Sequence, residues 1–200
     1  MTFSDNDNIK IFWENGKGEE LMKKPIVVNL FGGSGYGKST CAAYIFSQLK
    51  KDNYNVEFVF EFPKDLIYMT DITPPFNQAF VFGNQLWKIE QYLKNVDIVI
   101  TDSPILLSIV YNNTDYLGDS FAETVIKAFN SFNNINFLIE KSFDYNTSGR
   151  YQTEQEASIS HREIKDLLIK YQIQYQTVSA NDYDVIINSI TNYYRSSNKE

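Results

Sequence analysis

The sequence predicts a single α/β domain: a mostly parallel, five-stranded sheet with helices on both faces and a short lid. Apolar runs rich in β-branched residues alternate with segments of helical periodicity, as in parallel strands joined by helical crossovers. A glycine-rich loop separates the first apolar run from the first helical segment. The 200 residues, of which 43% are hydrophobic, suffice for one core but not comfortably for two.

The first elements surround the glycine-rich loop. Residues 1–24 are polar and mixed, and we treat them as an N-terminal extension of a domain that covers residues 25–200. Alternation before Asn15-Gly16 predicts a short strand and turn inside the extension. The run at 25–31 is continuously apolar, as expected of a strand buried on both faces. A helix over about 38–50 follows the loop.

The rest of the domain repeats this alternation. Strands are predicted from β-branched and aromatic runs, and helices from apolar residues three and four positions apart. A polar stretch over about 141–152, between the fourth strand and a helix, is typical of a mobile lid. The remaining strands are expected at 56–60, 96–102, 135–139 and 175–179, and the remaining helices at about 76–94, 104–111, 119–132, 154–171 and 182–194.

Charge and hydropathy argue against several classes of function. The net charge is −7, and arginine occurs only at positions 150, 162 and 195, so the sequence shows no basic face for gripping duplex nucleic acid. We therefore favour a small-molecule partner over nucleic acid. No apolar run approaches 18 residues and the N-terminus lacks a signal-peptide pattern, so we expect a soluble, cytoplasmic protein without a membrane segment.

The glycine-rich loop has the Walker A pattern, Gly-x₄-Gly-Lys-Ser, that binds nucleoside triphosphates. Glycines allow the backbone to approach phosphates closely, and the N–H groups of the loop and of the next helix point at them. We expect Lys38 to place its charge on the β- and γ-phosphates of ATP, and Ser39 to ligate Mg²⁺. The predicted nucleotide-binding residues are Gly32, Gly33, Ser34, Gly35, Tyr36, Gly37, Lys38, Ser39 and Thr40.

Asp102 ends the third predicted strand, about sixty residues after Lys38. In open α/β sheets, ligands bind at the carboxyl ends of the strands. A carboxylate there can hold Mg²⁺ with its waters or accept a proton from a hydroxyl group. We predict that Asp102 is a catalytic and metal-binding residue. An alternative role is to cap the helix near Pro104, for which Ser103 is equally suited.

Acidic and basic side chains also follow the second predicted strand. Glu61, Lys64 and Asp65 are predicted to bind the hydroxyl groups of a sugar-like acceptor. A solvated helix start, where the helix dipole favours acidic residues, is the alternative. On the long helix, Gln85 is a candidate for reading the edge of a base, whereas Trp87 is expected in the core.

The expected lid contains Arg150 next to Gly149. An arginine in this segment would reach the phosphates as the site closes and would stabilise the transferring group. Lys38, Asp102 and Arg150 are therefore the predicted catalytic residues, with an exposed loop arginine as the alternative for Arg150. His161 has no carboxylate or cysteine partner in its sequence pattern, and we expect it on a helix surface.

Taken together, four motifs resemble a known group of proteins. They are the loop at 32–40, Glu61-Phe-Pro-Lys-Asp65-Leu, Thr101-Asp102-Ser103-Pro104 and the stretch Gly149-Arg150-Tyr-Gln-Thr-Glu-Gln-Glu-Ala157. Over about 30–180 the chain resembles phage and bacterial P-loop proteins of the AAA-family ATPase group. These are similar to the nicotinamide-riboside kinase domain of bifunctional NAD-biosynthesis regulators. A phage-encoded member would act in the host cytoplasm.

The resemblance implies a P-loop NTPase fold of the nucleotide-kinase type. It also implies a phosphate position for Lys38, a metal position for Ser39, an acidic strand end for Asp102, a lid arginine for Arg150 and a substrate contact for Glu61. The sequence departs from the group at Pro63-Lys64, where Ala or Gly with Arg or Lys is commoner. The sensor and arginine-finger regions of a ring-forming motor do not fit within the 200 residues, so we do not expect such a motor.

The predicted function is transfer of the γ-phosphate of ATP, bound with Mg²⁺, to a hydroxyl group of a nucleoside-like acceptor. A nucleoside-monophosphate kinase is one alternative. Such an enzyme must hold an acceptor phosphate, usually with arginines, and the segment between the first helix and the lid offers lysines such as Lys64, Lys88 and Lys94 instead. Further alternatives are a kinase of 5-hydroxymethyl bases in phage DNA and an ATP-hydrolysing switch or interaction protein.

Overall fold

The computed structural model describes residues 24–70, 74–113, 115–142 and 153–198. The predicted turn before residue 24 and most of the predicted lid, with Arg150, lie outside these ranges. The strands are β1 (Ile26–Phe31), β2 (Val56–Val59), β3 (Ile98–Thr101), β4 (Asn134–Glu140) and β5 (Gln176–Ser179). The helices are α1 (Lys38–Lys51), α2 (Phe62–Thr70), α3 (Gln78–Leu93), α4 (Leu107–Val110), η1 (Asp115–Leu117), α5 (Gly118–Asn130), α6 (Glu154–Lys170) and α7 (Tyr183–Ser197).

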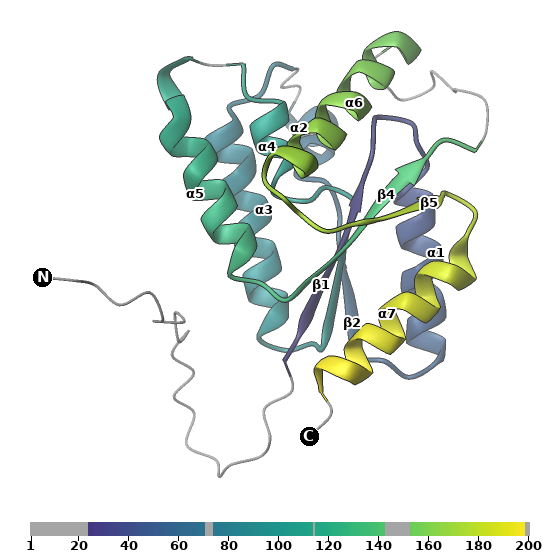
Figure 1. Cartoon of the computed structure of the whole chain (residues 1–200). Coiled ribbons are helices and arrows are strands. Elements are labelled where there is room, and N and C mark those ends of the chain that lie inside the picture. Colours follow the sequence, from purple (N-terminus) through teal and green to yellow (C-terminus); the bar gives the residue numbers. More distant parts are fainter. Residues whose placement is uncertain (1–23, 71–73, 114, 143–152, 199–200) are drawn as a thin grey trace, which may run out of the picture.

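The five strands form one sheet in the order β2-β3-β1-β4-β5, and every neighbouring pair is parallel. Figure 1 shows α1 and α7 on one face of the sheet and α3, α4, α5 and α6 on the other. The predicted α/β fold, with five parallel strands and helices on both faces, is therefore confirmed. Because all strands run the same way, their carboxyl ends meet at one edge of the sheet, where the glycine-rich loop also lies.

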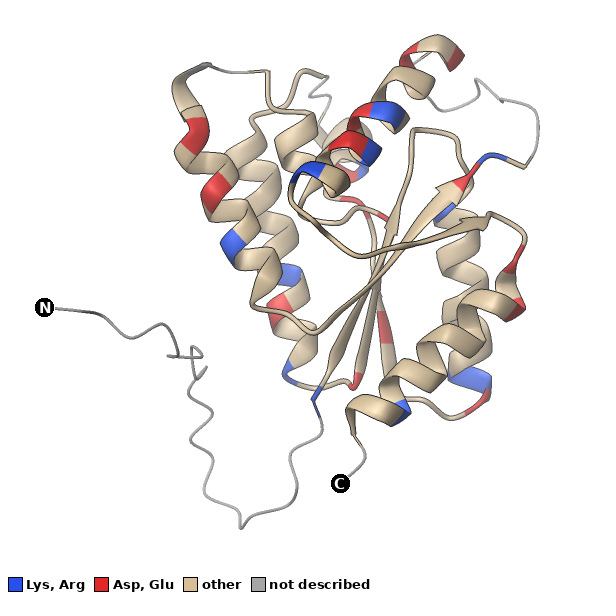
Figure 2. Ribbon diagram, viewed as in Figure 1, with Lys and Arg blue, Asp and Glu red and all other residues tan. Residues whose placement is uncertain are grey.

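Charged side chains are spread over the helices. In Figure 2, Lys and Arg residues occur singly among Asp and Glu residues, and neither sign gathers on one face in this view. None of the helices in the described ranges combines the length and the apolar character needed to cross a lipid bilayer.

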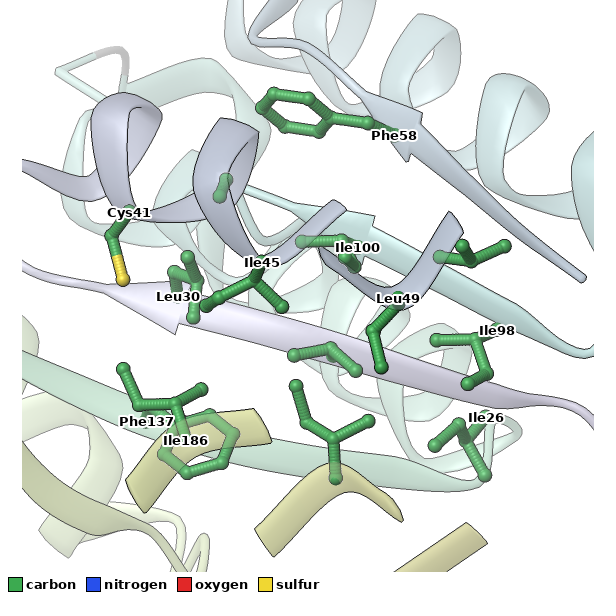
Figure 3. Close-up of a cluster of buried hydrophobic side chains, with 14 of the residues drawn as sticks. Ile26, Leu30, Cys41, Ile45, Leu49, Phe58, Ile98, Ile100, Phe137 and Ile186 are labelled. Atoms are coloured by element: carbon green, nitrogen blue, oxygen red, sulfur yellow. The ribbon is translucent and has the colours of Figure 1, made fainter. Parts of the chain in front are cut away.

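Two apolar clusters hold the sheet between its helical layers. All six residues of β1 are buried, and their side chains alternate between the two faces. Ile26 and Leu30 belong to the cluster shown in Figure 3, together with Cys41, Ile45 and Leu49 of α1. Val27 and Phe31 point to the opposite face of the sheet. There they belong to a second cluster with Phe129 of α5 and Leu168 of α6. Burial on both faces explains why β1 is a continuous apolar run.

The structure differs from the predicted elements in two places. Helix α2 is not among the predicted elements, although a helix start at this position is the alternative interpretation of Glu61 and Asp65. Trp87 was expected in the core, but its side chain is 60% exposed. The apolar stripe of α3 that packs inward consists of Val81, Phe82 and Ile89, and Trp87 lies off that stripe.

A buried amide network links β1 to β4 close to the loop. Asn29 is 1% exposed and donates from Nδ2 to Asn134 Oδ1 at 2.9 Å and to Asn136 Oδ1 at 3.0 Å. Asn134 donates in turn to the Phe129 carbonyl at the end of α5, and Asn136 donates to the Gln174 carbonyl before β5. These hydrogen bonds join β1, the strand that leads into the loop, to β4, to α5 and to the segment before β5.

We expect Asn29→Ala to lower the free energy of unfolding by about 1–3 kcal/mol, since two side-chain oxygens would lose their donor in or near the core. Asn188→Ala, on the exposed face of α7, is the matched control and should change it by no more than about 0.5 kcal/mol. Urea denaturation of both variants measures the difference. Equal effects in the two variants would show that the buried network contributes nothing specific.

Candidate active site

The glycine-rich loop connects the end of β1 to the start of α1. Gly35 and Gly37 have φ angles of 78° and 86°, a left-handed conformation that favours glycine. Gly37 is the N-cap of α1, and it provides no side-chain cap for the N–H groups of the first turn. A helix N-terminus of this kind attracts anions through its N–H groups and its dipole. The loop therefore has the geometry of a phosphate-binding site.

Gly33 is the point where the loop meets α6. A Cβ atom at this position would lie 2.4 Å from the Ala157 carbonyl oxygen and 2.9 Å from the Tyr36 ring. Such distances are far too short for a side chain, so this close approach requires glycine. The Lys38 ammonium donates to the Gly33 carbonyl at 2.8 Å, which holds the lysine side chain over the loop.

Asp102 follows β3 and lies beside the loop, as the strand order requires. Its side chain is 1% exposed, and the Ser39 hydroxyl is close enough to act on the carboxylate. Burial raises the pKa of Asp102, while the Ser39 hydroxyl and the Lys38 ammonium oppose that rise. The alternative role as a helix cap is wrong, because α4 starts at Leu107 with Leu106 as its N-cap.

The same carboxylate fits a magnesium ion. Asp102 Oδ1 is buried and has no hydrogen-bond partner within the described ranges, so a ligand is needed to satisfy it. No group of three or more His, Cys, Asp and Glu residues in the described part could hold a metal by itself. Magnesium is usually bound by one or two protein groups together with substrate phosphates and water, which suits Ser39, Asp102 and ATP.

Glu61 lies between β2 and α2 and faces the same space. Burial raises the pKa of Glu61, and the neighbouring Asp102 carboxylate raises it further, whereas Lys38 and Lys64 lower it. The two carboxyl groups thus come from the carboxyl ends of adjacent strands, and the charge of Asp102 acts on Glu61. The Ser39 hydroxyl acts on Asp102, while Glu61 lines the cavity close to Lys64 and Tyr111.

A single cavity of about 1190 Å³ is lined by the glycine-rich loop and by residues of α2 and α3. Its volume exceeds the roughly 300–1,000 Å³ of most pockets that hold one small molecule. Aromatic and apolar side chains form much of the far wall, among them Tyr68, Phe76, Val81 and Tyr111. Burial raises the pKa of Tyr111 to about 12, with Glu61 adding to the rise, so the phenol stays protonated. The cavity has room for a nucleotide and a second molecule.

The three other predicted substrate-binding residues differ in their positions. Lys64 lines the cavity. Asp65 forms a salt bridge of 3.0 Å with Lys88 of α3 and does not line the cavity, so its predicted contact with an acceptor stays a prediction. Gln85 lines the cavity, but its amide donates to Thr101 Oγ1 and accepts from the Phe62 N–H. A contact of Gln85 with an acceptor would compete with these hydrogen bonds.

Sequence reasoning missed several polar groups at the site. Ser108 of α4, Ser160 of α6 and Tyr111 line the cavity, and no local motif distinguishes them. The expectation that His161 lies on a helix surface is wrong, because its side chain is 11% exposed and packs against the loop. The sequence signal was its spacing from Ala157, four residues earlier on the same face of α6.

The comparisons with known proteins agree with this geometry. A thymidylate kinase from Ehrlichia chaffeensis has a similar fold, with a TM-score of 0.56 over 84% of this chain and 98% of that chain, at 13% sequence identity. No curated protein matches the sequence. The AAA domain family matches residues 27–184, from β1 into the first turn of α7. The chain therefore belongs to the AAA domain family and has the P-loop NTPase fold, similar to that of a nucleotide kinase.

Proposed function

We propose that this protein is a kinase that transfers the γ-phosphate of ATP to a hydroxyl group of a nucleoside-like small molecule. The observation that carries this proposal is the single cavity that runs from the P-loop to Glu61 and the aromatic wall beyond it. A protein that only bound or hydrolysed ATP would need no second chamber of this size next to the γ-phosphate position. A transferase needs one, because it must bring two substrates together.

The donor half of the site comprises the P-loop, Lys38, Ser39 and Thr40. The loop N–H groups and the start of α1 would bind the phosphates, with Lys38 on the β- and γ-phosphates. Lys38 is already held over the loop by the Gly33 carbonyl, within reach of that position. Ser39 and Asp102 would hold Mg²⁺, which neutralises charge on the β- and γ-phosphates when it is bound with ATP.

The acceptor half centres on Glu61. We assign Glu61 as the group that accepts the proton of the acceptor hydroxyl, because its raised pKa brings its basicity closer to neutrality. The hydroxyl oxygen then forms a bond to the γ-phosphorus as the bond to the β,γ-bridging oxygen breaks, and ADP leaves with that electron pair. Lys64 and the Tyr111 and Ser108 hydroxyls would position the acceptor.

An acceptor without a phosphate group fits the walls best. A monophosphate is doubly negative, and proteins usually hold it with forked arginine side chains. In the described part of the cavity wall, the cations are Lys38 and Lys64, and none is an arginine. Lys88 is paired with Asp65. The similarity to a thymidylate kinase concerns the fold and does not carry over its substrate.

Arg150, which lies outside the described residues, stays a prediction from the sequence as the group that stabilises the transferring phosphate. DNA carrying 5-hydroxymethyl bases remains an alternative acceptor. The scattered cations in Figure 2 provide no basic track for its backbone among the described residues, which favours a small molecule.

The direct test is a transfer assay with γ-labelled ATP and a panel of nucleosides, nucleoside monophosphates and hydroxymethylated DNA. We expect label to appear in a nucleoside-like product and ATP consumption to rise when that acceptor is added. An ATPase rate that no acceptor changes would contradict the kinase proposal and favour the ATP-hydrolysing switch.

Replacing Lys38 should weaken binding of ATP with Mg²⁺. We expect Lys38→Ala to raise the dissociation constant by at least about tenfold, as for loss of a hydrogen bond to a charged group. Lys51→Ala, at the opposite end of α1, is the control and should bind as the wild type does. Isothermal titration calorimetry measures both. Unchanged binding in Lys38→Ala would refute the role of the loop in phosphate binding.

Asp102 should matter more for phosphate transfer than for ATP binding. Asp102→Asn should retain ATP binding within about tenfold and lower phosphate transfer by a factor on the order of 10², as for a metal-orienting group. Initial rates at saturating acceptor measure this effect. Wild-type transfer rates in Asp102→Asn would reduce Asp102 to a structural residue at the end of β3.

The ionisation of Glu61 should determine how the rate of phosphate transfer falls at low pH. A proton-accepting carboxylate must be ionised, so the wild-type rate should rise as the pH increases through the raised pKa of Glu61. Glu61→Gln should lower the rate by a factor of about 10²–10⁴ and should lose this acid limb. A variant that keeps both rate and limb would exclude Glu61 as the proton acceptor.

A further inference from the structure

His161 of α6, the single histidine of the chain, packs directly against the P-loop. Its Nδ1 accepts the Gly33 N–H at an N–N distance of 3.3 Å. The imidazole ring stacks on the Tyr36 ring, with 4.3 Å between centroids and 14° between planes. The loop residue that tolerates no side chain is thus the one that His161 contacts.

Two contacts define the protonation state of this histidine. A backbone N–H always donates, so Nδ1 must be unprotonated to accept from Gly33. Nε2 lies 3.4 Å from the Glu140 carboxylate at the end of β4, and a carboxylate accepts, so Nε2 carries the proton. The geometry therefore requires the neutral Nε2–H form of His161.

The same loop residue also holds the phosphate-binding lysine. The Gly33 N–H donates to His161, and the Gly33 carbonyl accepts from Lys38 at 2.8 Å. The two peptide groups that flank the Gly33 Cα are therefore each fixed by a side-chain hydrogen bond. A change in the orientation of Gly33 would move the carbonyl that places Lys38.

We propose that His161 is a positioning residue for the P-loop: its neutral Nε2–H form fixes Gly33, and through Gly33 it places Lys38 for the phosphates. The inference rests on the nucleotide-binding part of the proposed function and is independent of the acceptor. His161 acts through Gly33 and Tyr36 and is not itself a phosphate ligand.

Protonation of His161 should undo this arrangement. The groups that face it in the described part of the chain are Glu140 from β4, Lys38 from α1, Tyr36 from the loop and Lys165 from α6. Burial lowers the pKa of His161, with Lys38 and Lys165 adding to the effect and Glu140 opposing it. At lower pH, a proton on Nδ1 would face the Gly33 N–H, and the hydrogen bond would be lost.

Because the chain has one histidine, its ring nitrogens can be observed by NMR in the wild-type protein without assignment variants. In the absence of nucleotide we expect the Nε2–H tautomer at pH 7.5, a pKa below the ordinary value of about 6.5, and a Gly33 amide signal that shifts with the same midpoint. A proton on Nδ1 at pH 7.5, or a Gly33 signal indifferent to the titration, overturns the inference and leaves the proposed function intact.

Two variants test the consequence for ATP bound with Mg²⁺. His161→Asn places an amide oxygen near the position of Nδ1 and cannot titrate, whereas His161→Gln places it near Nε2. At pH 7.5 we expect His161→Asn to bind ATP with a dissociation constant within about twofold of the wild-type value. We expect His161→Gln to bind ATP about 3- to 10-fold more weakly, the range of one hydrogen bond. Both variants lose the stacking on Tyr36, so their difference isolates the contact with Gly33.

The pH dependence then separates positioning from charge attraction. On going from pH 7.5 to 5.5, the wild-type dissociation constant should rise relative to that of His161→Asn. If the imidazolium instead attracted the phosphates, the ratio of the wild-type dissociation constant to that of His161→Asn would fall at pH 5.5, and that result would overturn the inference. Wild-type affinity in His161→Gln would overturn it as well. A wild-type protein that binds no ATP at either pH would overturn the proposed function and this inference together.

Discussion

The P-loop and Asp102 take their positions from β1, the central strand, which is buried on both faces and lies between two parallel neighbours. The register with β3 pairs Asn29 with Thr101, so the residue after Thr101 emerges beside the start of the P-loop. Asp102 reaches Ser39 for this reason, and Glu61 follows β2 at the same edge of the sheet. Parallel strand order therefore assembles a site from segments that are far apart in the sequence.

Burial at the carboxyl ends of the strands shifts the pKa values of the acidic groups in the site. Glu61, Asp102, Lys38 and Lys64 lie around one cavity, and removal from water raises the pKa of both Glu61 and Asp102. The groups nevertheless have different surroundings. Asp102 lies beside Ser39 of the P-loop, and Glu61 lines the cavity close to Tyr111. This division suits one carboxylate to a metal ion and the other to a proton.

Local features of the sequence predicted the fold and the core of the site. A Walker A motif, a strand-end aspartate and buried apolar strands follow from neighbouring residues, so they could be read directly. The exposure of Trp87, the pairing of Asp65 with Lys88 and the position of His161 depend on how helices rotate and pack. Those features are set by tertiary contacts between distant segments, and the spacing of His161 from Ala157 is only a weak local signal for one of them.

The central claim is that donor and acceptor share one cavity, with Glu61 beside the γ-phosphate position. The most direct measurement is the pKa of Glu61, followed by NMR of the ¹³C-labelled carboxyl group with and without a non-hydrolysable ATP analogue and Mg²⁺. We expect a raised pKa in the free protein, and a further rise with the bound analogue, whose net negative charge disfavours an ionised carboxylate nearby. An ordinary pKa that bound nucleotide leaves unchanged would contradict the account.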